Sequence, residues 1–153
     1  MTIPASRAAA KLRSDAERLA DIFTALQRCF LVRLSKDLAK GNVSFPQYLL
    51  LGFLVQQKQL SMTEIAHRMG HTTAAATGLV DRLEKLNLAK RTHARDDRRK
   101  ILVQPTPEGC ALVISVRDDM VGNLLKMMDA LEPAEQRAWL CIYEKIFALC
   151  QNH

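Results

Sequence analysis

The sequence predicts a mainly α-helical protein that carries one β-hairpin. Apolar residues recur at three- and four-residue steps over most of the chain, which is the spacing of amphipathic helices. Only six glycines and five prolines occur in 153 residues, which argues against a β-sandwich with many turns. One segment, 87–109, breaks this pattern, because a cluster of charged residues lies there between two short apolar runs. Hydrophobic residues make up 48% of the chain, which is enough for the core of one domain.

The first predicted helix covers residues 8–40. Its apolar stripe extends over more than about seven turns, through Leu12, Ala16, Leu19, Phe23, Leu26, Phe30, Leu34 and Leu38. Gly41 and Asn42 follow it and end the helix. One small domain covers a stripe of this length poorly, so we expect a second chain to lie against it.

The second predicted helix begins after Ser44 and runs to about Gln57. Ser44 and Gln47 can cap its first turn together, and Pro46 fits that turn without losing a hydrogen bond. Residues 48–55 are apolar nearly all round, which predicts a central helix rather than a surface helix.

A short third helix has strong signals at both ends. Ser61 and Glu64 form a capping box, and Leu60 and Ile65 occupy the hydrophobic-staple positions that flank it. Gly70 supplies the left-handed residue that ends the helix.

A fourth helix follows after a turn of one or two residues. Thr72 can cap it, it runs to Leu86, and Asn87 can take the left-handed position that ends it. Its inward face carries Leu79, Val80, Leu83 and Leu86. Its outward face carries Thr73, Ala74, Thr77, Gly78, Asp81, Arg82 and Lys85, and is small and polar near its start.

The predicted hairpin has a basic tip. From Ala89 to Lys100 there are two acids, Asp96 and Asp97, and six basic residues, namely Lys90, Arg91, Arg95, Arg98, Arg99 and Lys100. This segment carries +4 of the formal net charge of +6, and the rest of the chain is nearly balanced. A basic excess gathered on one ribbon indicates a polyanionic partner.

Two more helices complete the chain. Thr106 and Pro107 can start the first of them, which continues to Met128 or Asp129. Glu132 and Pro133 start the last, which carries wide apolar faces. No linker or internal repeat divides the sequence, so we treat 1–153 as a single chain.

In series, the short helix, the turn with Gly70, the fourth helix and the basic hairpin predict a winged helix-turn-helix. In this arrangement the third predicted helix supports the fourth, and the fourth enters the major groove of DNA. The hairpin reaches the flanking backbone or the minor groove. Thr72, Thr73 and Thr77 can hydrogen-bond to bases or phosphates, and Ala74 can contact a thymine methyl. Lysines and arginines would add affinity without base preference.

Over essentially its whole length, the sequence resembles the MarR family of bacterial transcriptional regulators. The resemblance is carried by Leu-Val-Asp-Arg-Leu-Glu-Lys at 79–85, Asp-Arg-Arg-Lys-Ile-Leu-Val at 97–103 and Thr-Pro-Glu-Gly at 106–109. It implies a homodimer held by helices 8–40 and 106–150, with winged lobes 44–105 that read a pseudo-palindromic double-stranded operator. It further implies a repressor that a small, often aromatic ligand releases from DNA.

The resemblance also assigns roles to single residues. Asp97 would pair with Arg99 and hold the wing, although such a surface pair contributes under about 1 kcal/mol. An arginine at or near the tip (Arg95, Arg98 or Arg99) would enter the minor groove. Arg82 and Lys85 would contact phosphates, unless Arg82 pairs with Asp81 or Glu84 instead.

Two positions depart from the family pattern. Pro105 stands where the family has leucine, and because proline cannot donate a ladder hydrogen bond, we expect the second wing strand to end at Gln104. Gly78 stands where a longer, often basic residue is common, which removes one possible DNA contact.

Several side chains are candidates for sensing a signal. Phe30, Tyr48 and Phe53 can line a pocket for an aromatic effector, although core packing explains each of them as well. Cys29, in the first long helix, is a candidate redox thiol, as in relatives that sense peroxides. The four cysteines are widely spaced, so buried, reduced thiols are the expected state.

Other functions find less support in the sequence. His67 and His71 are four residues apart, but Gly70 breaks the helix between them and spoils a shared metal-binding face. No hydrolase, P-loop or dinucleotide motif is present, so neither an enzyme nor a cofactor is expected. A winged-helix module that binds protein instead of DNA stays open as an alternative.

The chain is expected to be soluble and cytoplasmic, with no membrane partner. Its longest apolar run, 48–55, is far below the ~20 residues of a membrane span, and residues 1–13 contain no continuous apolar signal region.

Overall fold

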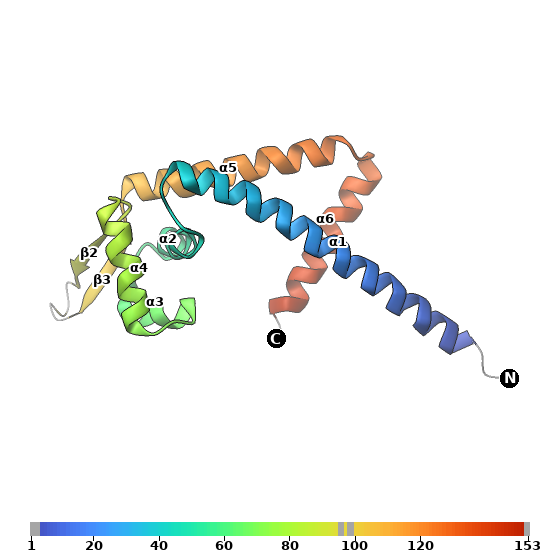
Figure 1. Cartoon of the computed structure of the whole chain (residues 1–153), viewed down its shortest axis with the longest axis horizontal. Coiled ribbons are helices and arrows are strands. Elements are labelled where there is room, and N and C mark those ends of the chain that lie inside the picture. The colour runs from blue at the N-terminus through green and yellow to red at the C-terminus, as the bar shows by residue number, and fades with distance from the viewer. Residues whose placement is uncertain (1–3, 95–96, 98–99, 152–153) are drawn as a thin grey trace. The chain divides into compact units, whose positions relative to one another are not determined.

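The computed structural model describes residues 4–94, 97 and 100–151. The chain divides into two compact units, Met1–Cys110 and Ala111–His153. The elements, shown in Figure 1, are α1 (Pro4–Lys40), α2 (Phe45–Gln57), β1 (Leu60–Ser61), α3 (Met62–Met69), α4 (Thr73–Lys85), β2 (Ala89–His93), β3 (Ile101–Pro105), α5 (Pro107–Asp129) and α6 (Pro133–Gln151). The prediction of a mainly α protein with a β-hairpin wing is confirmed.

The core of the first unit lies where α2, α3 and α4 gather beside the small sheet (Figure 1). Its fully buried side chains are Leu50, Leu51, Leu54, Ile65, Ala76, Val80, Leu83 and Val103. Three of these come from α2, which agrees with a helix that is apolar nearly all round. Of the inward face predicted for α4, Val80 and Leu83 are fully buried, while Leu79 and Leu86 are half-buried.

The helix ends follow the signals in the sequence. The Ser61 N–H donates to Glu64 Oε2 at 2.8 Å, and the Glu64 N–H donates to Ser61 Oγ at 3.3 Å, which completes the capping box of α3. Gly70 ends α3 with a φ of 63°, and Asn87 follows α4 with a φ of 56°. Both left-handed residues are therefore where the sequence predicts them.

The sheet has one strand more than the sequence predicts. Its order is β1-β3-β2, with both pairings antiparallel. Leu60 pairs with Val103 in the register of β1 and β3, so it serves as a strand residue as well as flanking the α3 cap. A segment of two residues is too short to show an alternating pattern. These residues form a strand only because β3, far along the chain, pairs with them.

The expected end of β3 at Gln104 is wrong by one residue, because Pro105 pairs with Ala89. The next ladder bond runs from the Thr106 N–H to the Leu88 carbonyl, at 3.1 Å. Ala89 and Pro105 are therefore a non-hydrogen-bonded pair, in which the nitrogen of Pro105 faces away from β2. On its other side, β3 meets β1 only at Val103 and Leu102, so the missing N–H breaks no bond of the sheet.

A tight joint forms where α4, the wing and α5 meet. Thr106 Oγ1 donates to the Asn87 carbonyl at 2.7 Å and accepts from the Gly109 N–H at 3.0 Å, so it caps α5 as predicted. Gly109 lies so close to the preceding turn that an added Cβ would be 2.1 Å from the Leu88 carbonyl oxygen.

In the second unit, a hydrogen-bonded turn joins α5 to α6. The Gln136 side-chain amide donates to the carbonyls of Met128 and Leu131, at 2.9 and 3.0 Å. Trp139 and Tyr143 meet edge to face along α6, with ring centroids 6.0 Å apart.

Large apolar side chains are exposed along the terminal helices. On α1 they are Leu12, Leu19, Ile22, Phe23, Leu26, Leu31 and Val32. On α6 they are Leu140, Ile142, Tyr143, Ile146, Phe147 and Leu149. The expectation of buried thiols is wrong for this single chain, because Cys29, Cys141 and Cys150 are exposed on these same helices and Cys110 is half-buried.

Gly109→Ala should lower the free energy of unfolding by about 3 kcal/mol, because the new methyl group overlaps a backbone oxygen that cannot move without opening the joint. Gly78→Ala is the matched control, since a Cβ at this exposed position of α4 meets nothing within 4 Å. It should raise stability by up to about 1 kcal/mol through helix propensity. Urea unfolding of both variants measures the difference, and equal effects would contradict the tight joint.

Candidate nucleic-acid interface

The helix-turn-helix is formed by α3, a short turn and α4. The His71 N–H donates to the Ala66 carbonyl at 2.9 Å, which holds the turn after Gly70. Thr72 Oγ1 accepts from the Ala75 N–H at 3.3 Å, which starts α4. Ala76 packs α4 into the core with no exposed surface. The N-terminal residues of α4 are thereby presented on a short, braced helix.

The outward face of α4 carries the residues that the sequence predicts there. Thr72, Thr73 and Ala74 are exposed. Thr77 is half-buried, and its hydroxyl donates to the Thr73 carbonyl at 2.8 Å. Its proton is therefore used within the helix, and it offers the outside only acceptor lone pairs. Thr72 keeps its hydroxyl proton as a donor, because its oxygen is the acceptor in the cap.

Two predicted phosphate contacts lie toward the other end of α4. Arg82 and Lys85 are both exposed. Gly78, also exposed, leaves open space beside the helix where a side chain would project. These two cations are therefore accessible from outside, although the same half of α4 also carries Asp81 and Glu84.

The partner of Asp81 and Glu84 is Arg91 on β2, not Arg82 as the sequence alone allowed. Arg91 Nη1 lies 2.8 Å from Asp81 Oδ1 and also pairs with Glu84 Oε2. The Arg91 N–H donates to Glu84 Oε1 at 2.8 Å. Helix geometry predicts ion pairs only between residues three or four apart on one helix. It could not predict an ion pair between a helix and a strand.

Part of the wing tip is described. The Ala94 N–H donates to the Lys100 carbonyl at 3.0 Å, and the Lys100 N–H donates to the Asp97 carbonyl at 2.9 Å. The predicted minor-groove residues Arg95, Arg98 and Arg99 lie outside the described residues. The pairing of Asp97 with Arg99 therefore stays a prediction.

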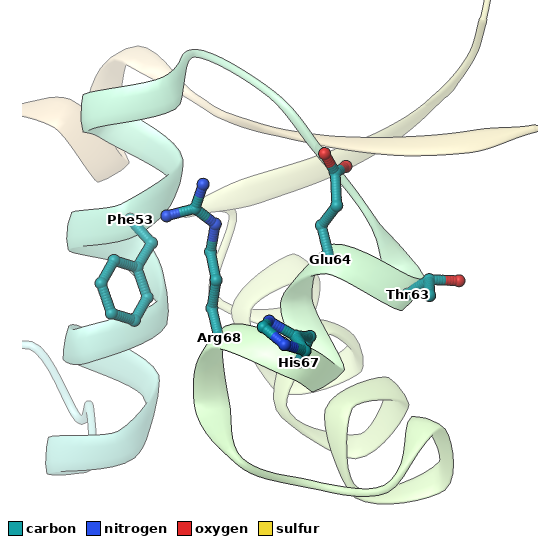
Figure 2. A pocket seen from close by; sticks show the side chains of 5 residues that line it. All are labelled: Phe53, Thr63, Glu64, His67 and Arg68. Atoms are coloured by element: carbon teal, nitrogen blue, oxygen red, sulfur yellow. The ribbon is translucent and has the colours of Figure 1, made fainter.

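A pocket of about 770 Å³ opens between α2 and α3. It is lined by Phe53, Thr63, Glu64, His67 and Arg68. Figure 2 shows the Arg68 side chain reaching from α3 toward α2, where the Phe53 ring lies. Hydrogen bonds from Ser61, with a smaller effect of the Arg68 charge, hold the pKa of Glu64 below its usual value. The pocket thus combines an aromatic ring with a guanidinium group.

The other candidate sensing residues are not among those that line this pocket. Phe30 on α1 and Tyr48 on α2 are half-buried, and burial raises the pKa of Tyr48. His67 and His71 are both exposed, on either side of the left-handed Gly70. Within the described residues, no group of three or more His, Cys, Asp or Glu side chains is placed to hold a metal ion.

Together, α3, α4 and the β2–β3 hairpin define a winged helix-turn-helix, which is a DNA-binding fold. A family model described as the MarR family matches residues 42–100. The chain belongs to the MarR family of transcriptional regulators. The members of this family are regulators and not enzymes.

Two curated relatives from Bacillus subtilis strain 168 are similar to the chain. The uncharacterized HTH-type transcriptional regulator YfiV is 33% identical over 110 residues, which cover 72% of this chain and 67% of YfiV. The HTH-type transcriptional repressor MdtR is 35% identical over 101 residues, covering 64% of this chain and 65% of MdtR.

A solved structure shares the fold. It is a mutant of MepR from S. aureus bound to an oligodeoxyribonucleotide, with a TM-score of 0.69 and 19% identity. The match covers 86% of this chain and 97% of that chain. As for membranes, none of the helices in the described part of the chain is long and apolar enough to cross one.

Proposed function

We propose that this protein binds a specific double-stranded operator as a homodimer and represses transcription until a small aromatic ligand releases it. The observation that carries DNA binding is the exposed start of α4, braced by α3 and joined to a cationic hairpin. Thr72, Thr73 and Ala74 would read base edges in the major groove, while Arg82 and Lys85 would hold phosphates. The DNA-bound MepR mutant and the repressor MdtR support this proposal.

The homodimer is supported by the exposed apolar side chains on α1 and α6. Leu12, Leu19 and Phe23 on α1 and Phe147 and Leu149 on α6 are each more than half exposed in the single chain. Apolar surfaces of this extent are rarely left in water. Two lobes held about 34 Å apart would read the two halves of a pseudo-palindrome.

The effector is proposed to bind in the pocket between α2 and α3. A flat ring can stack on Phe53 while its carboxylate pairs with the Arg68 guanidinium. Because α3 braces α4, a ligand wedged between α2 and α3 would move the recognition helix. A small change in the position of the recognition helix would lower operator affinity sharply, because both helices of the dimer must bind their half-sites at the same time.

Replacing Arg95, Arg98 and Arg99 together with alanine, hereafter the tip variant, should weaken operator binding roughly tenfold or more. The log-log dependence of binding on salt should become shallower by about 0.9 for each phosphate that these arginines neutralise in the wild type. Fluorescence anisotropy at two salt concentrations, with duplex from upstream of the protein's own gene, measures both. If the tip variant binds the operator as tightly as the wild type does, the result favours the alternative of a winged-helix module that binds protein.

Phe147→Glu should convert the dimer to a monomer, because it places a charge within the apolar surface of α6. Lys145→Glu is the control, since it adds the same side chain at an exposed position about 200° around the helix. Sedimentation equilibrium of both variants decides the matter. A wild-type protein that sediments as a monomer at micromolar concentration would contradict the dimer.

Phe53→Ala should weaken release of DNA by aromatic carboxylates such as benzoate by about tenfold, because the stacking face is lost. Phe30→Ala is the matched control, since Phe30 is also half-buried but does not line the pocket. The measurement is the ligand concentration that halves operator binding. Equal responses of the two variants would place the effector elsewhere.

A further inference from the structure

We propose that Arg91 is a positioning residue that locks the wing to the recognition helix through Glu84 and Asp81. In this arrangement the wing cations and α4 meet DNA in one fixed geometry. The inference rests on the proposed DNA binding, and it assigns Arg91 a role different from that of its basic neighbours. We name the contacts among Arg91, Glu84 and Asp81 the helix–wing clasp.

The clasp begins at the backbone of an edge strand. In the order β1-β3-β2, β2 has a strand neighbour on one side only. Hydrogen-bonded and non-hydrogen-bonded pairs alternate along an antiparallel ladder, so Arg91, two residues from the Ala89–Pro105 pair, is also non-hydrogen-bonded to β3. Its N–H therefore faces away from the sheet, where Glu84 Oε1 accepts it at 2.8 Å. A side chain of α4 thus satisfies an amide of the open sheet edge.

The guanidinium closes the clasp from the other side. It bonds both carboxylates, Asp81 at 2.8 Å and Glu84 through its second oxygen. The side chains of Arg91 and Glu84 are partly buried, with exposures of 26% and 31%, whereas that of Asp81 is exposed, at 50%. Water therefore screens the Arg91–Glu84 contact less than it screens an ordinary surface pair. Both carboxylates contact the same nitrogen, Nη1, whose two N–H groups can each donate to one of them.

The clasp also changes the charge that α4 presents to DNA. Asp81 and Glu84 are carboxylates on the helix that is proposed to approach a polyanion. Arg91 offsets one of these two negative charges locally, whereas Arg82 and Lys85 on the same helix are exposed to solvent. Arg91 is thus engaged with the protein itself and is poorly placed to act as a phosphate contact.

The base of the hairpin has anchors other than the clasp. Leu88, Ala89 and Val103 are buried and anchor the base of the hairpin. The joint at Thr106 fixes where the hairpin ends. Loss of the clasp should therefore leave a folded hairpin whose angle to α4 is no longer set. In that state the tip cations would contribute less to DNA affinity, because ordering the wing on DNA costs entropy at the moment of binding.

A double-mutant cycle on the full-length protein tests this. Operator affinity is measured for the wild type, the tip variant, Arg91→Met and the combination of the last two. In the wild-type background, removing the tip cations should weaken binding roughly tenfold or more. In the Arg91→Met background the same removal should weaken it less than about threefold, and the salt dependence of Arg91→Met should approach that of the tip variant.

Arg82→Met provides the matched control, since it removes a basic side chain from α4 without touching the clasp. Combined with the tip variant, it should be additive, so the tip cations keep their full effect. If the tip cations also keep their full effect in the Arg91→Met background, Arg91 is not a positioning residue and the inference is wrong. Should Arg91→Met fail to fold by circular dichroism, Glu84→Gln combined with Asp81→Asn replaces it, because the two changes remove both charge pairs of Arg91 and keep an oxygen for its N–H.

The experiment separates this inference from the function beneath it. If the wild type binds no DNA, or binds equally well without the tip cations, the proposed use of the wing is wrong and the inference falls with it. If the tip cations matter and the cycle is additive, DNA binding stands and the clasp as a positioning device is overturned.

Discussion

The recognition helix, both wing strands and α5 all depend on one joint around Thr106. Its hydroxyl donates to Asn87 at the end of α4 and accepts the N–H of Gly109 in the first turn of α5. Its backbone N–H bonds Leu88 at the start of the wing. Since one residue satisfies groups from three elements, the end of α4, the base of the hairpin and the start of α5 are defined together. Gly109 is required there because the chain passes a carbonyl with no space for a Cβ.

Charge on the winged lobe is divided between two tasks. Arg91 is held against Glu84 and Asp81, while Arg82, Lys85 and Lys100 are exposed. A polyanion attracts all cations, but only those without a protein partner are free to exchange counterions for phosphates. The formal charge of the hairpin thus overstates what it offers to DNA, and part of that charge serves to hold the hairpin in place.

The terminal helices differ from the lobe in how little of their apolar surface is buried. The core of the first unit is filled by α2, α3, α4 and β3, whereas α6 has no buried residue among those described. The apolar stripe of α1 is likewise exposed over most of its length. The same surface places three of the four cysteines in contact with solvent, so thiol burial in this chain depends on what covers these helices.

The helices, their ends and the order of the recognition elements follow from local signals along the chain. Ser61 with Glu64, Gly70, Thr72, Asn87 and Thr106 act on groups within a few residues of themselves, so their effect can be inferred without knowing the fold. The outward and inward faces of α4 follow for the same reason, since helical geometry alone sets which residues share a face.

The features that join distant segments depend instead on how the elements pack in space. The strand at Leu60 exists because β3 pairs with it, and Pro105 is accepted because its nitrogen happens to face the unpaired side. The clasp joins a helix to a strand across a turn, where no sequence spacing predicts a contact. These features depend on register and on the approach of two elements in space, which local signals do not encode.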